Sequence, residues 1–226
     1  MPKFCFGITA TDTDAGKTFV TCLLARAFRK NYPTAKITAV KPFATGSRSD
    51  AEQLTAALSD PTDPSDPTDL SPFFWKKPAA PLVAARSENL PPPDLAAARD
   101  WVRARAARSD ILLVEGIGGW LVPLTEKETW ADFAAALDLP QILVVPNRIG
   151  AINAAALSTQ AIRASGVPFI GCILNTLRSE QDGSEESNAK ILEEIFQIPV
   201  LGKIPFGAET LPPEIFDHVV RQASAL

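Results

Sequence analysis

The chain has 226 residues, enough for one large domain with a substantial hydrophobic core. Its formal net charge is -4, from 26 acidic and 22 basic residues, so no cationic face for nucleic acid or an anionic membrane is expected. A single histidine, His218, argues against a multi-histidine metal site and against a Ser-His-Asp triad.

Short apolar runs alternate with longer segments of helical periodicity. Strands are predicted at residues 3–9, 36–41, 110–115, 141–146, 169–174 and 200–205. Helices are predicted at residues 17–31, 50–59, 94–108, 129–138, 151–165 and 187–196. The strand runs lack polar alternation, which is typical of strands covered on both faces. The pattern predicts an α/β fold in one domain over residues 1–226, with a doubly wound, mostly parallel sheet and helices on both faces.

Residues 59–93 interrupt this alternation. They hold nine of the 20 prolines, a density that argues against a central strand or a regular helix. The stretch PFFWKKPAAPLVAA within them is too apolar for a solvated linker. We expect an excursion that folds over the rim of the sheet as part of the substrate wall, or equally a plain ordered loop.

The N-terminal stretch, the apolar runs and the cysteines all bear on where the protein is found in the cell. The N-terminal stretch reaches acidic residues too early for a signal peptide, and no apolar run attains the roughly 18 residues of a membrane span. Cys5, Cys22 and Cys172 lie in apolar segments, a scattered odd set typical of buried free thiols. We therefore expect a cytoplasmic protein.

The stretch GITATDTDAGKTF, residues 7–19, joins the first strand to the first helix and approaches a phosphate-binding loop. The strict spacing G-x-x-x-x-G-K-[ST] would need glycine where the chain has Thr11. Free amides at the helix start suit phosphate oxygens, Lys17 would reach the β- and γ-phosphates, and Thr18 would face Mg²⁺. In the alternative interpretation, Asp14 only caps the helix and Gly16 eases the turn.

Three further strand ends carry candidate residues. In DILLVEGIGGW, residues 110–120, Glu115 ends an apolar strand and could bind Mg²⁺, although a tight turn beside an exposed glutamate is the alternative. Lys41 ends the second strand, and Asp50 could cap the next helix or bind the metal. Residues 150–153 begin a helix whose free amides could receive a carboxylate, but a capped, alanine-rich packing helix is the simpler interpretation.

Together these motifs resemble the dethiobiotin synthetase family. The resemblance rests on TDTDAGKT, VKPFATGS followed by SDA, VEGIGGWLVPL, IGAINAAAL, and ILNT ahead of LGKIP, in this order from residue 9 to about residue 206. It implies a homodimer with a P-loop NTPase-like α/β fold. It also implies ATP-dependent carboxylation and ring closure of 7,8-diaminononanoate with CO2, through a carbamate and a carbamic-phosphoric anhydride.

The resemblance also implies roles for individual residues. Lys17, Lys41 and Thr13 would act in catalysis, and Thr18, Asp50 and Glu115 would hold Mg²⁺. The nucleotide would contact Asp14, Ala15, Gly16, Phe19, Gly116, Gly118, Asn175, Thr176, Pro205, Phe206 and Gly207. The substrate would contact Asp12, Thr45, Gly150, Ala151, Ile152 and Asn153, with its carboxylate at the helix start across the dimer interface.

The chain departs from the family pattern at two positions. Ala10 stands where glycine is usual and is acceptable only if its φ is negative. Asn188 stands where an aromatic substrate contact is expected.

Three other functions remain open at this point. A cobyrinate-type amide ligase usually carries an added glutaminase domain, for which 226 residues leave no room. A partition or division ATPase would carry a further lysine early in the loop, where this chain has Thr11 and Asp12. An inactive nucleotide-binding module is disfavoured by the intact Lys17, Thr18 and Glu115.

Overall fold

A computed structural model describes residues 4–58, 67–180 and 182–225 of the chain. Its centre is a six-stranded sheet with the strand order β2-β5-β1-β6-β7-β8, and every neighbouring pair is parallel. The strands are β1 (Phe4–Ala10), β2 (Ile37–Val40), β5 (Ile111–Glu115), β6 (Gln141–Pro146), β7 (Phe169–Asn175) and β8 (Val200–Ile204). The predicted strands are thus confirmed, apart from residue 3, which lies outside the described residues.

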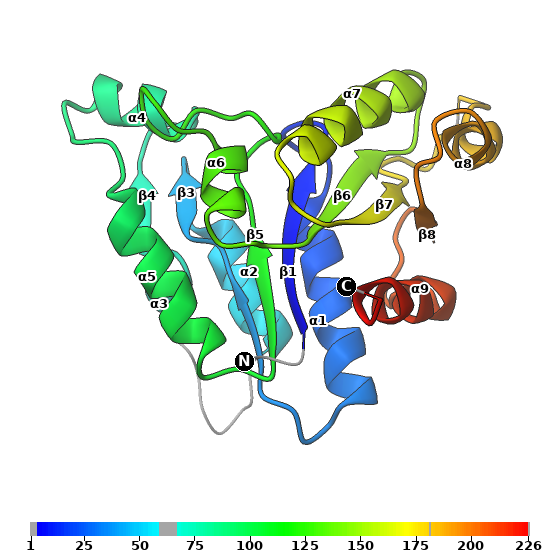
Figure 1. Ribbon diagram of the computed structural model, residues 1–226, viewed down its shortest axis with the longest axis horizontal. Helices are drawn as coiled ribbons and strands as arrows, with labels where there is room; N and C mark the ends of the chain where they lie inside the picture. Colours follow the sequence, from blue (N-terminus) through cyan, green and yellow to red (C-terminus); the bar gives the residue numbers. More distant parts are fainter. Residues whose placement is uncertain (1–3, 59–66, 181, 226) are drawn as a thin grey trace.

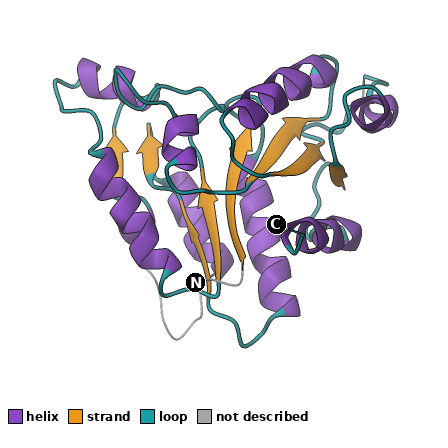
Figure 2. Cartoon of the chain, in the orientation of Figure 1, coloured by secondary structure: helices purple, strands orange, loops and turns teal. Residues whose placement is uncertain are grey.

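Helices cover both faces of this sheet. The longer ones are α1 (Lys17–Asn31), α2 (Ser49–Leu58), α5 (Leu95–Ala106), α7 (Ala151–Ala164), α8 (Glu185–Glu194) and α9 (Pro213–Ala223). In Figure 1, α1 and α2 lie behind the sheet, whereas the short helix α6 (Trp130–Ala135) lies in front of it. Figure 2 shows the same layering, with strands enclosed between helices. The α/β class and the doubly wound parallel sheet are therefore confirmed.

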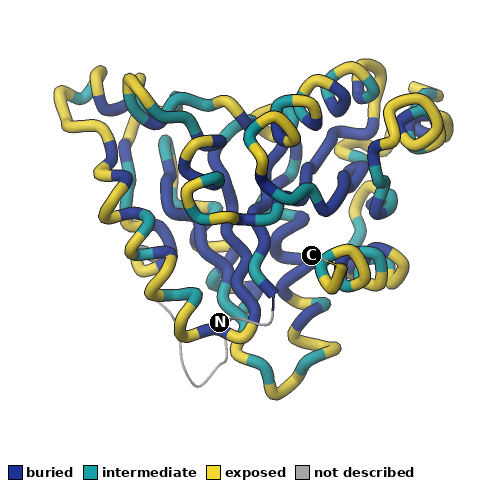
Figure 3. The backbone as a smooth tube through the Cα atoms, in the orientation of Figure 1, coloured by how far each residue is buried: buried dark blue, intermediate teal, exposed yellow. Residues whose placement is uncertain are grey.

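The core follows the middle strands. The side chains of β5 and β6 are buried along their whole lengths, and β1 and β7 are nearly so. Figure 3 shows this as a continuous buried zone through the centre of the molecule, with exposed backbone in the outer helices and loops. Apolar runs without polar alternation form these strands because both of their faces contact helices. The strands are parallel, so their carboxyl ends all meet at one edge of the sheet.

The proline-rich excursion is more regular than predicted. Residues 59–66 lie outside the described part of the chain, but the rest includes α3 (Pro67–Leu70), β4 (Phe73–Trp75) and α4 (Pro81–Ser87). The expectation of no regular helix was wrong for α4, because Pro81 occupies its first turn, where a missing N–H costs nothing. Within the described residues 67–93 the expectation of no central strand holds, since β4 pairs there with β3 (Phe43–Thr45) in a separate two-stranded sheet.

Other differences concern element ends and the C-terminus. The helix predicted at 129–138 ends at Ala135, and Asp138 just beyond it has a positive φ of 48°. The C-terminal helix α9 was not predicted. Its Ile215 is fully buried and packs on Gly202 of β8, where a Cβ atom would lie 2.5 Å from the Ile215 side chain.

No helix among the described residues is both long enough and apolar enough to cross a membrane.

Candidate active site

The loop between β1 and α1 presents open backbone amides. Gly16 is the N-cap of α1, with φ 88°, and no side chain caps the helix. The alternative in which Asp14 caps α1 is therefore wrong. A Cβ atom on Gly16 would also lie 2.2 Å from Asn175 Nδ2, so both the positive φ and the close approach require glycine. Free amides at a helix N-terminus form a site that favours anions.

Ala10 and Lys17 lie at the two ends of this loop. The Nζ atom of the buried Lys17 lies 3.4 Å from the carbonyl oxygen of Asp12 and donates to it. Ala10 is the last residue of β1 and does not have a positive φ, so the alanine there carries no left-handed strain.

Lys41, Asp50, Glu115 and Thr18 meet beside the loop. The Lys41 ammonium lies 2.5 Å from Asp50 Oδ2 and 2.8 Å from Glu115 Oε1. The Thr18 hydroxyl donates to the same Glu115 oxygen at 2.7 Å. The side chains of Lys41 and Glu115 are 6% and 0% exposed, and that of Asp50 is 36% exposed. We call these four residues the charged cluster.

Burial and charge shift the pKa values of these groups. Burial lowers the pKa of Lys17 to about 8, and the positive charge of Lys41 adds to this effect. Burial alone would also lower the pKa of Lys41, but the carboxylates of Glu115 and Asp50 outweigh it and raise that pKa above its ordinary value. Burial tends to raise the pKa of Asp50, yet the contact with Lys41 keeps it below its usual range. The raised pKa of Lys41 and the lowered pKa of Asp50 both favour the charged forms of this ion pair.

The charged cluster fits a magnesium ion chemically. Its donors are carboxylate and hydroxyl oxygens, which Mg²⁺ prefers, and Glu115 Oε2 is buried without a hydrogen-bond partner. Among the described residues there is no group of three or more His, Cys, Asp or Glu side chains that could hold a metal alone. Two carboxylates and a hydroxyl suit a metal that takes its remaining ligands from phosphates and water.

The glycine-rich loop after β5 packs beside the β1–α1 loop. A Cβ atom on Gly119 would lie 3.5 Å from the carbonyl oxygen of Ala10. Gly118 has a positive φ of 58°, so the turn itself requires glycine. A Cβ atom on Gly116 would lie 2.7 Å from Trp130, which is fully buried. Close packing against Trp130 therefore favours glycine at position 116, a reason that the sequence analysis did not anticipate.

The ends of β7 and β8 adjoin the loop from the other side. Asn175 is buried, its Nδ2 donates to the carbonyl oxygen of Ala15 at 3.0 Å, and its Oδ1 is buried without a partner. Thr176 follows it and is half-buried. Residues 205–207 follow the neighbouring strand β8, and Phe206 is 56% exposed. These residues, all predicted to contact the nucleotide, therefore end or follow adjacent strands of the sheet.

The residues predicted to contact the substrate fall into two places. Gly150 is the N-cap of α7 with φ 90° and no side-chain cap, so the helix start is open except at Ala151, whose amide donates to the carbonyl oxygen of Arg148 at 3.0 Å. Asp12 is exposed on the β1–α1 loop, and both it and Gly150 border one small hollow. Thr45 instead ends β3, where it pairs with Trp75 of β4. Strand β4 of the proline-rich excursion therefore lies directly beside Thr45.

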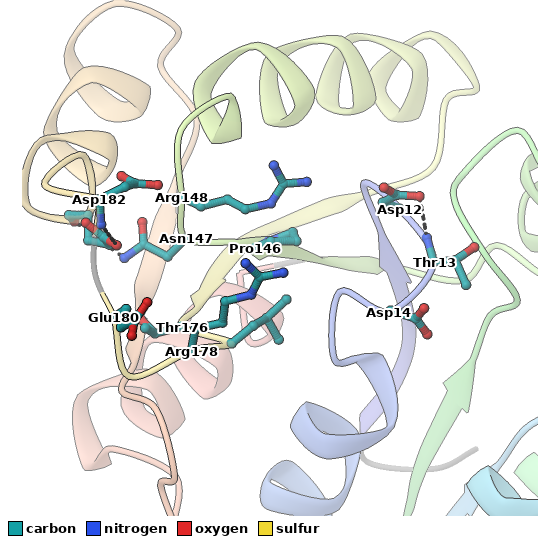
Figure 4. Close-up of a pocket in the computed structure, with 12 residues that line it drawn as sticks. Asp12, Thr13, Asp14, Pro146, Asn147, Arg148, Thr176, Arg178, Glu180 and Asp182 are labelled. Carbon is teal, nitrogen blue, oxygen red and sulfur yellow. Dashed lines mark hydrogen bonds between the residues drawn. The ribbon is translucent and has the colours of Figure 1, made fainter.

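Between the β1–α1 loop and the ends of β6 and β7 lies a pocket of about 620 Å³. Figure 4 shows Asp12 and Asp14 on one side of it, with the guanidinium groups of Arg148 and Arg178 extending into it from the other. Arg178 was not singled out in the sequence. It lies two residues after ILNT, and no local pattern distinguishes it from a solvated arginine.

Asn188 lies behind this pocket. It is buried, and its Nδ2 donates to Asn147 Oδ1 at 2.9 Å, so it holds the β6 end against α8. The aromatic contact expected at this position is replaced by a buried amide pair.

A parallel sheet with a glycine-capped loop and a lysine at the start of α1 defines a P-loop nucleotide-binding protein. Solved structures share the fold. A plasmid partition protein from Borrelia burgdorferi aligns with a TM-score of 0.61 at 11% identity, covering 98% of this chain and 100% of that one. The septum site-determining protein MinD complexed with Mg-ADP from Pyrococcus horikoshii aligns with a TM-score of 0.57 at 15% identity, covering 98% and 90%.

Sequence comparisons go further. The sequence model of a family described as "AAA domain" matches residues 6–214. The protein named ATP-dependent dethiobiotin synthetase BioD from Akkermansia muciniphila is 36% identical over 93% of this chain and 96% of its own length. The protein of the same name from Aromatoleum aromaticum is 37% identical over 92% and 93%. The chain belongs to the ATP-dependent dethiobiotin synthetase family, a family of ligases.

Proposed function

We propose that this chain is an ATP-dependent cyclo-ligase that makes dethiobiotin from 7,8-diaminononanoate and CO2 in the cytoplasm. One amine attacks CO2 to give a carbamate. A carbamate oxygen then attacks the γ-phosphorus of ATP, which releases ADP and leaves a carbamic-phosphoric anhydride. The second amine attacks the carbonyl carbon, phosphate leaves, and the ureido ring closes. Phosphoryl transfer of this kind depends on positioning and charge neutralisation, so it needs no histidine.

The residues of the charged cluster and the loop have assigned roles in this proposal. Lys17 and the open amides of α1 bind the phosphates, and Lys41 stabilises charge on the carbamate and the transferred phosphoryl group. Thr18, Asp50 and Glu115 hold Mg²⁺, which neutralises phosphate charge when it is bound. Thr13, on the β1–α1 loop, acts with Lys17 and Lys41 in catalysis. Asn175, Thr176 and residues 205–207 contact adenine, and the loops at 14–19 and 116–118 contact the phosphates.

One observation carries the choice of substrate. Asp12 and Asp14 line one side of the pocket, and the guanidinium groups of Arg148 and Arg178 enter it from the other side, where Glu180, Asp182 and Glu185 also line it. The two carboxylates beside the phosphate loop match a molecule that carries two amines. The amines would lie near Asp12, beside the phosphate loop, Thr45 would contact the substrate, and the helix start at residues 150–153 would receive its carboxylate across the dimer interface.

We further propose that the chain forms one domain and works as a homodimer. Ile149 is 67% exposed and Leu157 of α7 is 59% exposed, so the face around α7 offers apolar area for a second copy. Light scattering after size-exclusion chromatography measures this directly, and a monomer at micromolar concentration would contradict it.

The partition-type ATPase is the alternative function. The likeness to partition and division proteins supports the fold alone, at 11–16% identity. Relatives at 33–42% identity over most of the chain are named dethiobiotin synthetases instead.

The test is release of phosphate from ATP with bicarbonate, with and without 7,8-diaminononanoate. The diamine should stimulate release, and dethiobiotin should accumulate in equal amount. Lys41→Met should abolish turnover while ATP still binds, and Lys190→Met, which alters an exposed pair with Glu194, should leave turnover unchanged. A wild-type protein that hydrolyses ATP at the same rate with and without the diamine would refute the proposal.

A further inference from the structure

Lys41 occupies the position between the two carboxylates that are assigned to the metal. Its ammonium contacts Asp50 Oδ2 at 2.5 Å and Glu115 Oε1 at 2.8 Å, so one side chain joins both. The Glu115 oxygen involved also accepts from Thr18. All three candidate ligands are therefore arranged around, or next to, an organic cation that belongs to the chain itself.

A divalent ion bound to both carboxylates would lie close to the Lys41 ammonium. That ammonium takes Asp50 Oδ2 and Glu115 Oε1, so a metal that needs these oxygens must compete with it, although Glu115 Oε2 has no partner. If the ammonium stayed between the carboxylates, it would also repel the incoming ion at short range. Metal binding and the present position of Lys41 therefore oppose each other.

The backbone of Lys41 is fixed by the sheet, whereas its side chain can move. The Lys41 amide donates to the carbonyl oxygen of Leu70 at 2.9 Å, and the residue directly follows β2 in the central sheet. The side chain, with its four flexible methylene groups, is the part that can move. It starts from the carboxyl edge of the sheet, so a displaced ammonium remains at the rim beside the β1–α1 loop.

We propose that Lys41 is an exchangeable counter-cation of the metal site, which a divalent metal displaces toward the reacting groups. This rests on the proposed function, because it takes Thr18, Asp50 and Glu115 as the metal ligands. Without metal, the ammonium neutralises two neighbouring carboxylates, one of them fully buried. With metal, the ion takes over that role and the lysine becomes available to the carbamate and the phosphoryl group. The lysine thus reaches the substrates only when the metal is in place.

The first test measures metal binding without nucleotide or diamine. Free Mn²⁺ is titrated by electron paramagnetic resonance against the wild type, Lys41→Met and Lys17→Met. Lys41→Met should bind Mn²⁺ at least about tenfold more tightly than the wild type, because the competing ammonium is gone. Lys17→Met is the matched control: it removes a buried positive charge from the same site but leaves the contacts to Asp50 and Glu115. It should change the affinity much less.

Equal or weaker Mn²⁺ binding by Lys41→Met would overturn the proposal, as would equal tightening by Lys17→Met. Thermal unfolding supplies a second readout. Without metal, Lys41→Met should melt below the wild type, and saturating Mn²⁺ should raise its melting temperature more than that of the wild type. A larger rise for the wild type would also overturn the proposal.

A measurement on the unmodified chain covers the case in which the variant does not fold. The Nζ resonance of Lys41, observed in ¹⁵N-lysine protein, should shift on titration with Mg²⁺ as its contacts to the carboxylates are lost. A resonance that stays in place at saturating Mg²⁺ would refute displacement. These tests contain no diamine, so their failure is separate from failure of diamine-stimulated phosphate release.

Discussion

Gly116 offers a sharp test of how the glycine-rich loop is built. Adding a methyl group in Gly116→Ala would place a Cβ atom 2.7 Å from Trp130 Cε2 and 2.9 Å from Trp130 Nε1. Ordinary carbon contacts lie near 3.5–4.0 Å, so about 1 Å of overlap must be relieved. Trp130 is fully buried and stacks on Phe133 at 5.4 Å, with Phe43 edge-on at 6.5 Å, so its ring cannot simply withdraw.

Overpacking of this kind typically costs about 1–3 kcal/mol. For a chain of this size each kcal/mol lowers the melting temperature by roughly 2–4 °C, so a fall of about 2–12 °C is expected. The matched control is Gly119→Ala in the same loop. Neither glycine has a positive φ, and the nearest atom to a Cβ on Gly119 is 3.5 Å away, so a loss under about 0.5 kcal/mol is expected.

Urea denaturation of the two variants beside the wild type measures the difference in free energy of unfolding. Equal stability of Gly116→Ala and Gly119→Ala would refute the packing argument. ATP affinity measured on the folded variants then separates packing from ligand contact. If Gly116 is needed only for Trp130, the affinity of Gly116→Ala per folded molecule should match that of the wild type.

Three further predictions concern the framework around the site. Asn175→Ala should lower the free energy of unfolding by about 1–3 kcal/mol in urea denaturation, because the buried carbonyl of Ala15 loses its donor; a loss below about 0.5 kcal/mol would contradict this. Gly150→Ala should cost about 1–2 kcal/mol from its φ of 90° alone, since no atom lies within 4 Å of the added Cβ; an unchanged melting temperature would show that the turn relaxes freely. Hydrogen bonds from the amide and the hydroxyl of Thr129 hold the pKa of Asp132 below its ordinary value. A pKa that is lower in the folded state stabilises the protein above the unfolded pKa of about 3.9. This stabilisation is lost as the pH falls through the folded pKa. Asp132→Asn should therefore destabilise the chain at pH 7 and make no difference below both pKa values, and an equal effect at both pH values would rule out the charge as the cause.

Local patterns in the sequence predicted the sheet strands and their helices well. Apolar runs bounded by polar or glycine residues are local signals, and each strand formed within a residue or two of its predicted bounds. The excursion was harder, because the helix at Pro81 and the strand at residues 73–75 depend on contacts with residues 42–45 and on a proline in a first turn. The C-terminal helix α9 was missed although its Ile215 and Val219 recur at helical spacing.

Some residues of the candidate site could also be predicted from the local sequence, and others could not. The Gly-Lys-Thr triplet, Glu115 after an apolar strand and the open helix start at Gly150 could be identified from neighbouring residues. Arg178 could not, because nothing local distinguishes it from a solvated arginine; its meaning comes from the pocket that it enters opposite Asp12.

By itself, the sequence determined the fold class, the phosphate-binding loop and the family, since these follow from the local order of apolar runs and motifs. The tertiary structure alone decided what Lys41 touches. Lys41 and Glu115 are 74 positions apart and meet because β5 pairs with β2, which places the two strand ends side by side. No local pattern carries the strand order of a sheet, because that order depends on which buried faces pack together once the chain has folded.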